Sequence, residues 1–349
     1  LKASMGGGGK GMRLIHSEDE VVEAYETARS ESMSSFGDDT VYIEKFVEEP
    51  HHIEFQILGD NHGNVIHLFD RECSVQRRNQ KIVEESPSPF LTPELRREMG
   101  KKSRGRRPRG ELLRRRHHRV PRRQAPPLLF FWKMNTRLQV EHPITEEVVG
   151  VDLVKEQLRV ANGEVLHLKQ DELYQRGHAI ECRICAEDTE NNFMPSPGII
   201  QQLTEPNGIG VRIDSYVYEG YEIPLYYDPM IGKLIVWATT RQFAIERMRR
   251  VLYEYKITGV KNNLKYLRRI MFTPDFVRGE YNTLFIEKNA KMLQRSNWHN
   301  EEIENIAMMA AYIDYLMNLE ENTPSSTDGD NRPISRWKQF GLQKGVLRI

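Results

Sequence analysis

The sequence predicts an α/β protein, and three observations support this prediction. Segments in which apolar and polar residues alternate, as is typical of strands, are interleaved with segments of helical periodicity. A hydrophobic content of 39% with 29% charged residues is ordinary for a globular chain. The 349 residues exceed the ~100 to 200 of a usual single domain, so we expect one large domain with attachments, or two domains.

The composition also argues against membrane and secreted classes. No apolar run approaches the ~18 residues of a membrane span, which predicts a soluble protein without a membrane partner. Cys73, Cys182 and Cys185 cannot all pair, and nothing suggests export, so we expect a cytoplasmic location. The chain begins "LKASMGGGGKGM", without an initiator Met or a signal peptide, so we expect an N-terminally truncated fragment.

The periodicity predicts the elements in order. Helices are expected over 17–32, where Ser17 would cap acidic first-turn residues, and over 92–103, 150–163 and 241–255. Strands are expected over 40–49, in a hairpin over 51–76 that turns at 60–63, and over 134–146, 178–188 and 234–239. A mostly helical, polar tail follows residue 300.

One basic segment breaks this pattern. Residues 101–123 hold twelve Lys or Arg and one acid, Glu111, although the net charge of the chain is zero. Sparse apolar residues and four prolines should prevent any regular element over 104–127, so we expect poor order or poor packing there. A real basic insertion and an arginine-rich surface for nucleic acid or an acidic partner are both possible interpretations, but no interleaved aromatic residues support base stacking.

The glycine-rich start is a candidate phosphate loop. In "KASMGGGGKGM" four consecutive glycines would let backbone N–H groups crowd around phosphate oxygens, while Lys2 and Lys10 supply positive charge. The spacing is not that of a Walker motif, and a flexible linker is the alternative interpretation.

Two further polar segments are candidate ligand sites. Glu44 and Lys45 at a strand end could pair with a purine amino edge, or form a solvated turn. The segment "DRECSVQRRNQKIVEESPSP" places Gln76, Asn79 and Lys81 among arginines, which suits a small anion such as bicarbonate or phosphate. A solvated charged strand is the alternative.

Alternation in "MNTRLQVEHPITE" would place four polar side chains on one face of a strand. These are Asn135, Arg137, Gln139 and Glu141, a set that suits a metal, an anion and a general base.

"ECRIC" has the C-x-x-C spacing, but no second pair accompanies it and Cys182 and Cys185 would face opposite sides of a strand. Buried structural cysteines are therefore expected, and Arg183 is the more interesting residue.

Several of these motifs together resemble a known family. "KASMGGGGKGMR", "DRECSVQRRNQK", "MNTRLQVEHPITE", "GHAIECRICAED" and "YYDPMIGKLI" are similar to motifs in the biotin carboxylase of acetyl- and propionyl-CoA carboxylases. The resemblance implies an ATP-grasp fold: a lid subdomain over 1–46, a large subdomain with a biotin carboxylase C-terminal domain over 47–300, and a polar helical extension over 301–349.

The resemblance also implies an activity, that of an ATP-dependent ligase. ATP and Mg2+ or Mn2+ would activate bicarbonate as carboxyphosphate, and biotin on a carrier protein or domain would capture the CO2 released. The implied partners are that carrier, a carboxyltransferase subunit, which selects the acyl-CoA acceptor, and a second copy of the chain; nucleic acid is not among them.

The resemblance assigns roles residue by residue. The nucleotide contacts are Lys2, Gly8, Gly9, Glu44, Lys45, Phe46, Val47, His52, Gln76 and Asn79. Lys81, Arg137 and Val140 would contact bicarbonate, Glu141 would deprotonate it, and Arg183 would steady the biotin ureido oxygen.

One position departs from the family. A glutamate that should hold the metal with Asn135 is replaced by Lys133, and a cation there would repel Mg2+, so the chain as written should be inactive. We hypothesise that residues 102–133 are translated out of frame, since a Leu-Glu pair encoded TTGGAA, read one base later and followed by A, becomes the Trp-Lys of 132–133. A non-catalytic assembly subunit is the alternative.

Overall fold

A computed structural model describes residues 1–5, 12–44, 46–104, 113–116, 128–131, 134–294 and 308–313, with the backbone alone for 113–116 and 128–131. The chain divides into two units, Leu1–Arg295 and Ser296–Ile349. In the second unit the six described residues are helical and exposed, and the rest of the expected helical tail lies outside the described residues. So do four residues with assigned roles: Gly8, Gly9, Lys45 and Lys133.

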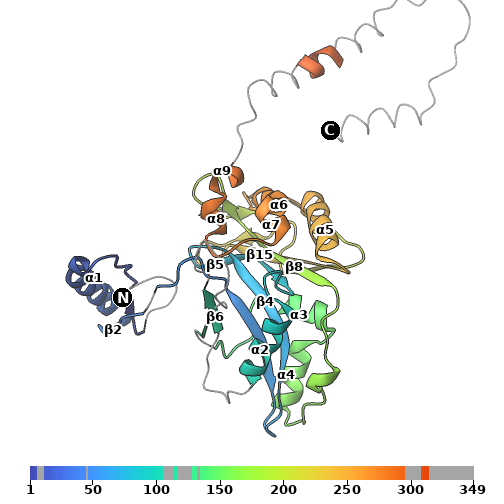
Figure 1. Cartoon of the computed structure of the whole chain (residues 1–349). Coiled ribbons are helices and arrows are strands. Elements are labelled where there is room, and N and C mark those ends of the chain that lie inside the picture. The colour runs from blue at the N-terminus through green and yellow to red at the C-terminus, as the bar shows by residue number, and fades with distance from the viewer. Residues whose placement is uncertain are drawn as a thin grey trace, which may run out of the picture. The chain divides into compact units, whose positions relative to one another are not determined.

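A six-stranded sheet forms the centre of the first unit, and each neighbouring pair of strands is antiparallel (Figure 1). Its order is β13-β15-β8-β5-β4-β3, with bounds β3 Ile53–Gly59, β4 Val65–Arg77, β5 Gln80–Ser86, β8 His178–Cys185, β13 Val211–Ser215 and β15 Met230–Ala238. The predicted hairpin over 51–76 and the strands near 178 and 234 are confirmed, because their alternation matches a sheet with distinct faces.

Helices and short strands complete the described residues. The helices are α1 Val21–Phe36, α2 Pro93–Arg104, α3 His142–Val149, α4 Leu153–Ala161, α5 Arg241–Glu254, α6 Leu264–Phe272, α7 Pro274–Arg278, α8 Phe285–Lys288 and α9 Ala290–Leu293, with 3-10 turns η1 Glu18–Glu20 and η2 Gln170–Glu172. The short strands are β1 Lys2–Ala3, β2 Val41–Tyr42, β6 Leu113–Arg116, β7 Leu128–Phe131, β9 Glu187–Asp188, β10 Met194–Pro195, β11 Gly198–Ile199, β12 Gln202–Thr204, β14 Glu222–Ile223 and β16 Lys256–Thr258. The four predicted helices are all present.

The two faces of the sheet differ in character. On one face the apolar side chains of β5, β8 and β15 join those of α5 and α6 in the largest core cluster, to which Val83, Cys182 and Met248 belong. On the other face Ile144 of α3 packs against Ala179 of β8. Since side chains alternate along a strand, this second face also carries Glu181 and Arg183, so it can hold a polar site beneath α3.

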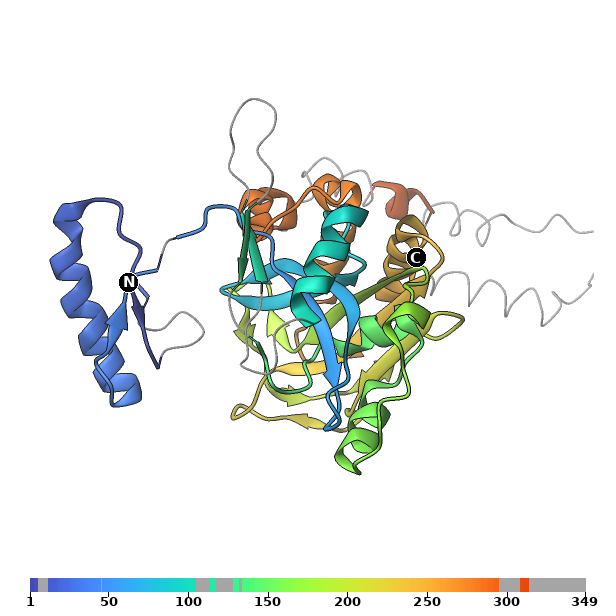
Figure 2. The same ribbon diagram turned by 60° about the horizontal axis from the view of Figure 1, so that its bottom comes forward.

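Helix α2 fixes the hairpin side of the sheet. Figure 2 shows α2, in teal, lying across the blue strands β3 and β4. Its Met99 is fully buried with Ile53 and Leu91 in a small cluster of their own. Burial of each such side chain contributes roughly 1.5–3 kcal/mol, which helps to hold the first strand of the site in place. Among the described residues, no helix has both the length and the apolar character that crossing a membrane requires.

Three local predictions are wrong. Ser17 precedes the first helical turn in extended conformation, but its side chain makes no capping hydrogen bond, and α1 begins only at Val21. The strand expected over 40–49 is limited to Val41–Tyr42. Within 104–127 the expectation of no regular element is wrong at Leu113–Arg116, which form a strand paired with Leu128–Phe131 outside the six-stranded sheet. Residues 105–112 and 117–127 lie outside the described residues, so the expectation of poor order or packing stays a prediction.

The strand expected from residue 134 is also absent. Residues 134–141 form an irregular loop that turns at Val140 and Glu141 and leads into α3. Pro143 stands in the first turn of α3, where its fixed φ and missing N–H favour a helix start. The alternation of polar residues therefore does not place them on one face of a strand.

Candidate active site

A buried lysine joins two glutamates on the face of the sheet beneath α3. The Lys81 Nζ on β5 lies 2.6 Å from Oε1 of Glu54 on β3, and it also donates a hydrogen bond to Oε1 of Glu141, the residue before α3. Their side chains are 13%, 2% and 3% exposed, respectively. Three segments far apart in sequence thus meet in one ion cluster that is nearly closed to water.

Arg183 on β8 approaches the same glutamate from its other side. Its Nη2 lies 3.0 Å from Oε2 of Glu141, and its Nε donates to Oε1 of Glu84 at 2.8 Å. The Gln139 amide donates to Oε1 of Glu141 at 2.9 Å. Each oxygen of the Glu141 carboxylate therefore faces a cation, so that the carboxylate bridges a lysine and an arginine.

A second arginine ties the loop before α3 to the sheet. The guanidinium of Arg71 is fully buried and donates to Oε2 of Glu54 at 3.3 Å and to Oε1 of Gln139 at 2.8 Å. It also donates to Thr145 on α3 at 3.1 Å. The loop that carries Glu141 has no strand partners over 134–141, so these side-chain bonds fix its position.

The charges of the cluster stabilise one another's ionised forms. Burial opposes ionisation of Glu54, but the nearby Lys81 charge and the contact with His52 hold the pKa of Glu54 well below its usual value. Burial also opposes the charge on Lys81 and Arg183, yet the surrounding carboxylates raise the pKa of both groups. Glu54, Lys81 and Arg183 are therefore ionised at neutral pH and preorganised to hold charge.

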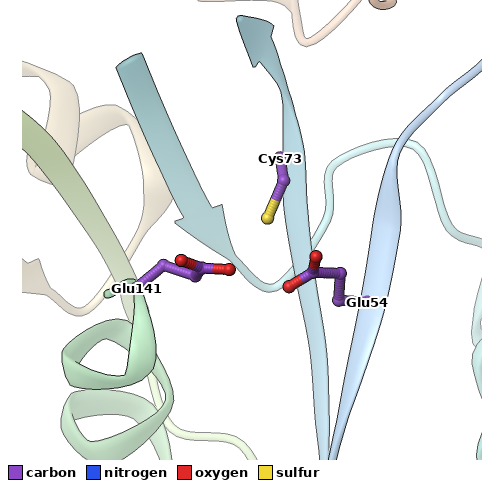
Figure 3. A group of neighbouring side chains, drawn as sticks. All are labelled: Glu54, Cys73 and Glu141. Carbon is purple, nitrogen blue, oxygen red and sulfur yellow. The ribbon is translucent and has the colours of Figure 1, made fainter. Parts of the chain in front are cut away.

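Glu54, Cys73 and Glu141 point toward one another, and one ligand atom of each lies within 4.8 Å of the others (Figure 3). This group does not fit a metal ion. The Lys81 ammonium already binds both carboxylates, where a cation would have to lie. Burial raises the pKa of the Cys73 thiol well above its usual value, and only the thiolate is a good metal ligand.

The structure brings together some of the sequence-predicted residues. Lys81, Glu141 and Arg183 meet directly, and the Val140 carbonyl accepts a hydrogen bond from Lys233 on β15 at 3.3 Å. Arg137 is exposed, and its guanidinium donates to the neighbouring Leu138 carbonyl, so the expectation that it shares a face with Glu141 is wrong.

The residues assigned to the nucleotide are distributed over several elements. Lys2 on β1 pairs with Glu44 at 3.2 Å, and the His52 Nε2 lies 3.0 Å from Glu54 in the cluster. Asn79 is exposed at the turn between β4 and β5 with a positive φ of 64°. The remaining described members are an exposed Phe46 and partly buried Val47 and Gln76. Asn135, which was assigned to the metal, is also partly buried.

Sequence reasoning missed Glu54, Arg71 and Lys233 as members of the site. Glu54 and Lys233 lie in mostly apolar strands, whereas Arg71 lies between Asp70 and Glu72 in β4. Glu54 and Arg71 are at most 1% exposed. For Glu54 and Lys233 the signal is a charged residue where the strand pattern requires an apolar one, because a buried charge needs a partner.

Comparisons with known proteins agree with this architecture. Residues 1–169 match the family described as carbamoyl-phosphate synthase L chain, ATP binding domain, and residues 181–288 match the biotin carboxylase C-terminal domain. The chain is 53% identical over 288 residues to a pyruvate carboxylase subunit of Methanothermobacter thermautotrophicus, covering 82% of this chain and 58% of that protein. It is 50% identical over 300 residues to biotin carboxylase of Nostoc sp., covering 83% of this chain and 65% of that protein.

Solved structures give the same result. The biotin carboxylase domain dimer of Hydrogenobacter thermophilus 2-oxoglutarate carboxylase, in complex with MgADP, ADP and bicarbonate, superposes with a TM-score of 0.76 at 43% identity, covering 85% of this chain and 65% of that one. The biotin carboxylase of Campylobacter jejuni, in a β,γ-ATP complex, gives a TM-score of 0.75 at 41% identity, covering 82% and 64%.

The fold is therefore that of an ATP-grasp protein with a biotin carboxylase C-terminal domain. Within that class, the chain belongs to the biotin carboxylase family. It spans 58% and 65% of the length of the two relatives compared above.

Proposed function

We propose that the protein of which this chain is part carboxylates biotin on a carrier protein, using ATP and bicarbonate. The observation that carries the proposal is the Glu141 carboxylate held between Lys81 and Arg183. Bicarbonate resembles a carboxylate, since it is planar, carries one negative charge and offers oxygens to two donors. A pocket that orients a carboxylate between two fixed cations can orient bicarbonate in the same way.

Each residue of the cluster would have a separate role in the reaction. Lys81 and Arg183 would hold the anion and the negative charge that develops on its oxygens, while Glu141 would take the proton of bicarbonate. Glu54 would keep the Lys81 ammonium oriented, since it is 2.6 Å away and nearly unexposed. Lys233 would set the Val140 carbonyl beside the anion, and Arg71 would hold the loop through Gln139.

The metal implied by the family does not fit the residues present. Asn135 is the one donor assigned to it that the sequence retains, and Lys133 stands where a carboxylate is expected. A lysine cannot bind a divalent cation while it is charged, so we derive no step through Mg2+. This substitution supports a second candidate function, a non-catalytic subunit that contributes to assembly.

The partners follow from the chemistry. Biotin must arrive on a biotin carboxyl carrier protein or domain, and a carboxyltransferase must use the carboxylated product. A homodimer and a cytoplasmic location complete the proposal.

A binding experiment tests the anion site on the chain itself. Sodium bicarbonate should raise the thermal unfolding temperature of the chain, and Lys81→Met should abolish that increase. Lys261→Met is a matched control, because Lys261 pairs with Asp188 and its side chain is 68% exposed. An increase that survives in Lys81→Met would refute the assignment of the anion to this cluster.

A second experiment separates catalysis from assembly. The DNA that encodes residues 95–140 is sequenced again from the source, and the full-length protein it encodes is assayed for bicarbonate-dependent ATP hydrolysis. If an acid precedes Met134, we expect turnover, reduced ~100-fold or more by Glu141→Gln and unaffected by the exposed Glu164→Gln. A confirmed Lys133 together with folded, inactive protein would leave the assembly function.

A further inference from the structure

Two buried carboxylates face each other next to Arg183. Glu84 on β5 and Glu181 on β8 are directly opposite in the antiparallel register and are 1% and 0% exposed. Residues opposite each other in such a pair point to the same face, with Cβ atoms roughly 4.5–5.5 Å apart. The two acid groups therefore share a small, dry space under α3.

The surrounding residues supply too few hydrogen-bond donors for the four oxygens of these carboxylates. Oε1 of Glu84 accepts from the Arg183 Nε at 2.8 Å. Oε2 of Glu84 and both oxygens of Glu181 have no hydrogen-bond partner among the described residues. Lys233 on β15 lies opposite Arg183, but its ammonium forms an ion pair with Asp214 at 2.9 Å and donates a hydrogen bond to the Val140 carbonyl.

Two ionised groups could not persist in this arrangement. Each would be desolvated, they would repel each other, and three oxygens would lack a donor. One proton on the pair removes the repulsion and converts an unsatisfied acceptor into a donor for the opposite carboxylate. Glu84 already binds Arg183, which favours its ionised form, so the proton belongs mainly on Glu181.

We propose that Glu84 and Glu181 hold one proton between them at neutral pH, and that this proton lets an anion bind beside Arg183. The charged groups around Glu181 are Glu84, Lys233, Arg183 and Glu141. Burial first and the charge of Glu84 second raise the pKa of Glu181 well above its usual value, in agreement with the geometry.

The proton matters because Glu181 stands two residues from Arg183 on the same face of β8. An ionised Glu181 would add a negative charge to a cluster that must accept bicarbonate. It would also compete with Glu141 for Arg183 and with Val140 for Lys233. A neutral Glu181 leaves both cations in their observed contacts, so it is a positioning residue. This role in anion binding rests on the proposed function, whereas the shared proton does not.

Infrared difference spectroscopy on the chain with 13C-labelled glutamate tests the proton directly. At neutral pH we expect the carbonyl stretch of a protonated glutamic acid, and we expect this band to disappear as the pH is raised. The spectrum of Glu181→Gln should lack the band. Absence of the band from the unsubstituted chain would overturn the proposal, and this measurement does not depend on how any variant folds. A band that persists in folded Glu181→Gln would overturn it as well.

Binding of sodium bicarbonate then tests the consequence. The affinity of the unsubstituted chain should fall about tenfold, as expected for one unfavourable buried charge, over the pH range in which the band disappears. Glu181→Gln, which mimics the protonated acid, should retain its affinity over that range. An equal fall in both proteins would refute the positioning role. Binding to neither protein, with the band present, would refute the proposed function and leave the shared proton intact.

Discussion

Replacing Glu85 with Gln should destabilise the first unit by about 3 kcal/mol at neutral pH. Glu85 is fully buried on β5 and accepts hydrogen bonds from Arg241 Nε at 2.7 Å, from His178 and from the Tyr281 hydroxyl. Although burial raises it, Arg241 and His178 lower the pKa of Glu85 to about 2, from an ordinary 4.5. The difference between these two pKa values, at about 1.36 kcal/mol for each pKa unit, gives the predicted loss of stability.

The pH dependence of this effect has a definite sign. Because the pKa of Glu85 is depressed on folding, its stabilisation is complete above pH 4.5 and is lost as the pH falls toward 2. Urea unfolding, followed by circular dichroism, measures the free energy of unfolding of Glu85→Gln and of the unsubstituted chain. The difference between these two free energies should become smaller below pH 4.5.

A matched control is available in the same region. Glu280→Gln removes a surface ion pair with Arg278, and the Glu280 side chain is 70% exposed. This substitution should change the free energy of unfolding by less than about 0.5 kcal/mol. The reasoning would be refuted if Glu85→Gln cost less than about 1 kcal/mol at pH 7, or if its cost did not narrow in acid.

Two further predictions concern backbone geometry and the thiols. Gly177→Ala should cost more than about 2 kcal/mol in urea unfolding, since φ is +70° and the new Cβ would lie 2.4 Å from the Ala238 carbonyl oxygen. Gly163→Ala, at φ +87° with no atom within 4 Å of the new Cβ, should cost only about 1 kcal/mol. Equal losses of stability in the two variants would refute the argument that a steric clash destabilises Gly177→Ala. Cys73 and Cys182 are fully buried, and burial raises the pKa of both thiols, so a thiol reagent should label neither until the chain is unfolded. Rapid labelling of either under native conditions, measured by mass spectrometry, would disprove this.

The elements that the sequence predicted correctly are long and have one strong period. The hairpin of β3 and β4 alternates over many residues, and α5 keeps a helical stripe of buried residues that includes Met248 and Leu252. Residues 134–141 misled the prediction because a loop can alternate by chance, and only Pro143 marked the coming helix. Periodicity identifies a face only where tertiary pairing makes the segment regular.

Local sequence predicted part of the site, and the fold supplied the rest. Lys81 and Glu141 were recognised within polar segments, and the structure joins them directly. Glu54 is a single charge in a mostly apolar strand, and Arg71 lies between the buried Asp70 and Glu72 of β4. Their partners lie 27 and 68 residues away in sequence, on Lys81 and Gln139. No local pattern carries information about partners at such separations, so these contacts emerge only from the fold.

The basic segment bears on whether this site is complete in nature. The match to the ATP-binding family runs through residues 1–169 and so spans the segment without a change of family on either side. Helix α2 before it packs on β3 and β4, and Glu141 after it reaches Lys81, so both flanks keep the positions that the cluster requires. An insertion would lengthen this connection, whereas two compensating shifts of reading frame would alter its composition and nearly preserve its length. The out-of-frame hypothesis for residues 102–133 would explain how the sequence keeps Lys81 and Glu141 of the cluster while Lys133 stands where the family resemblance implies a glutamate.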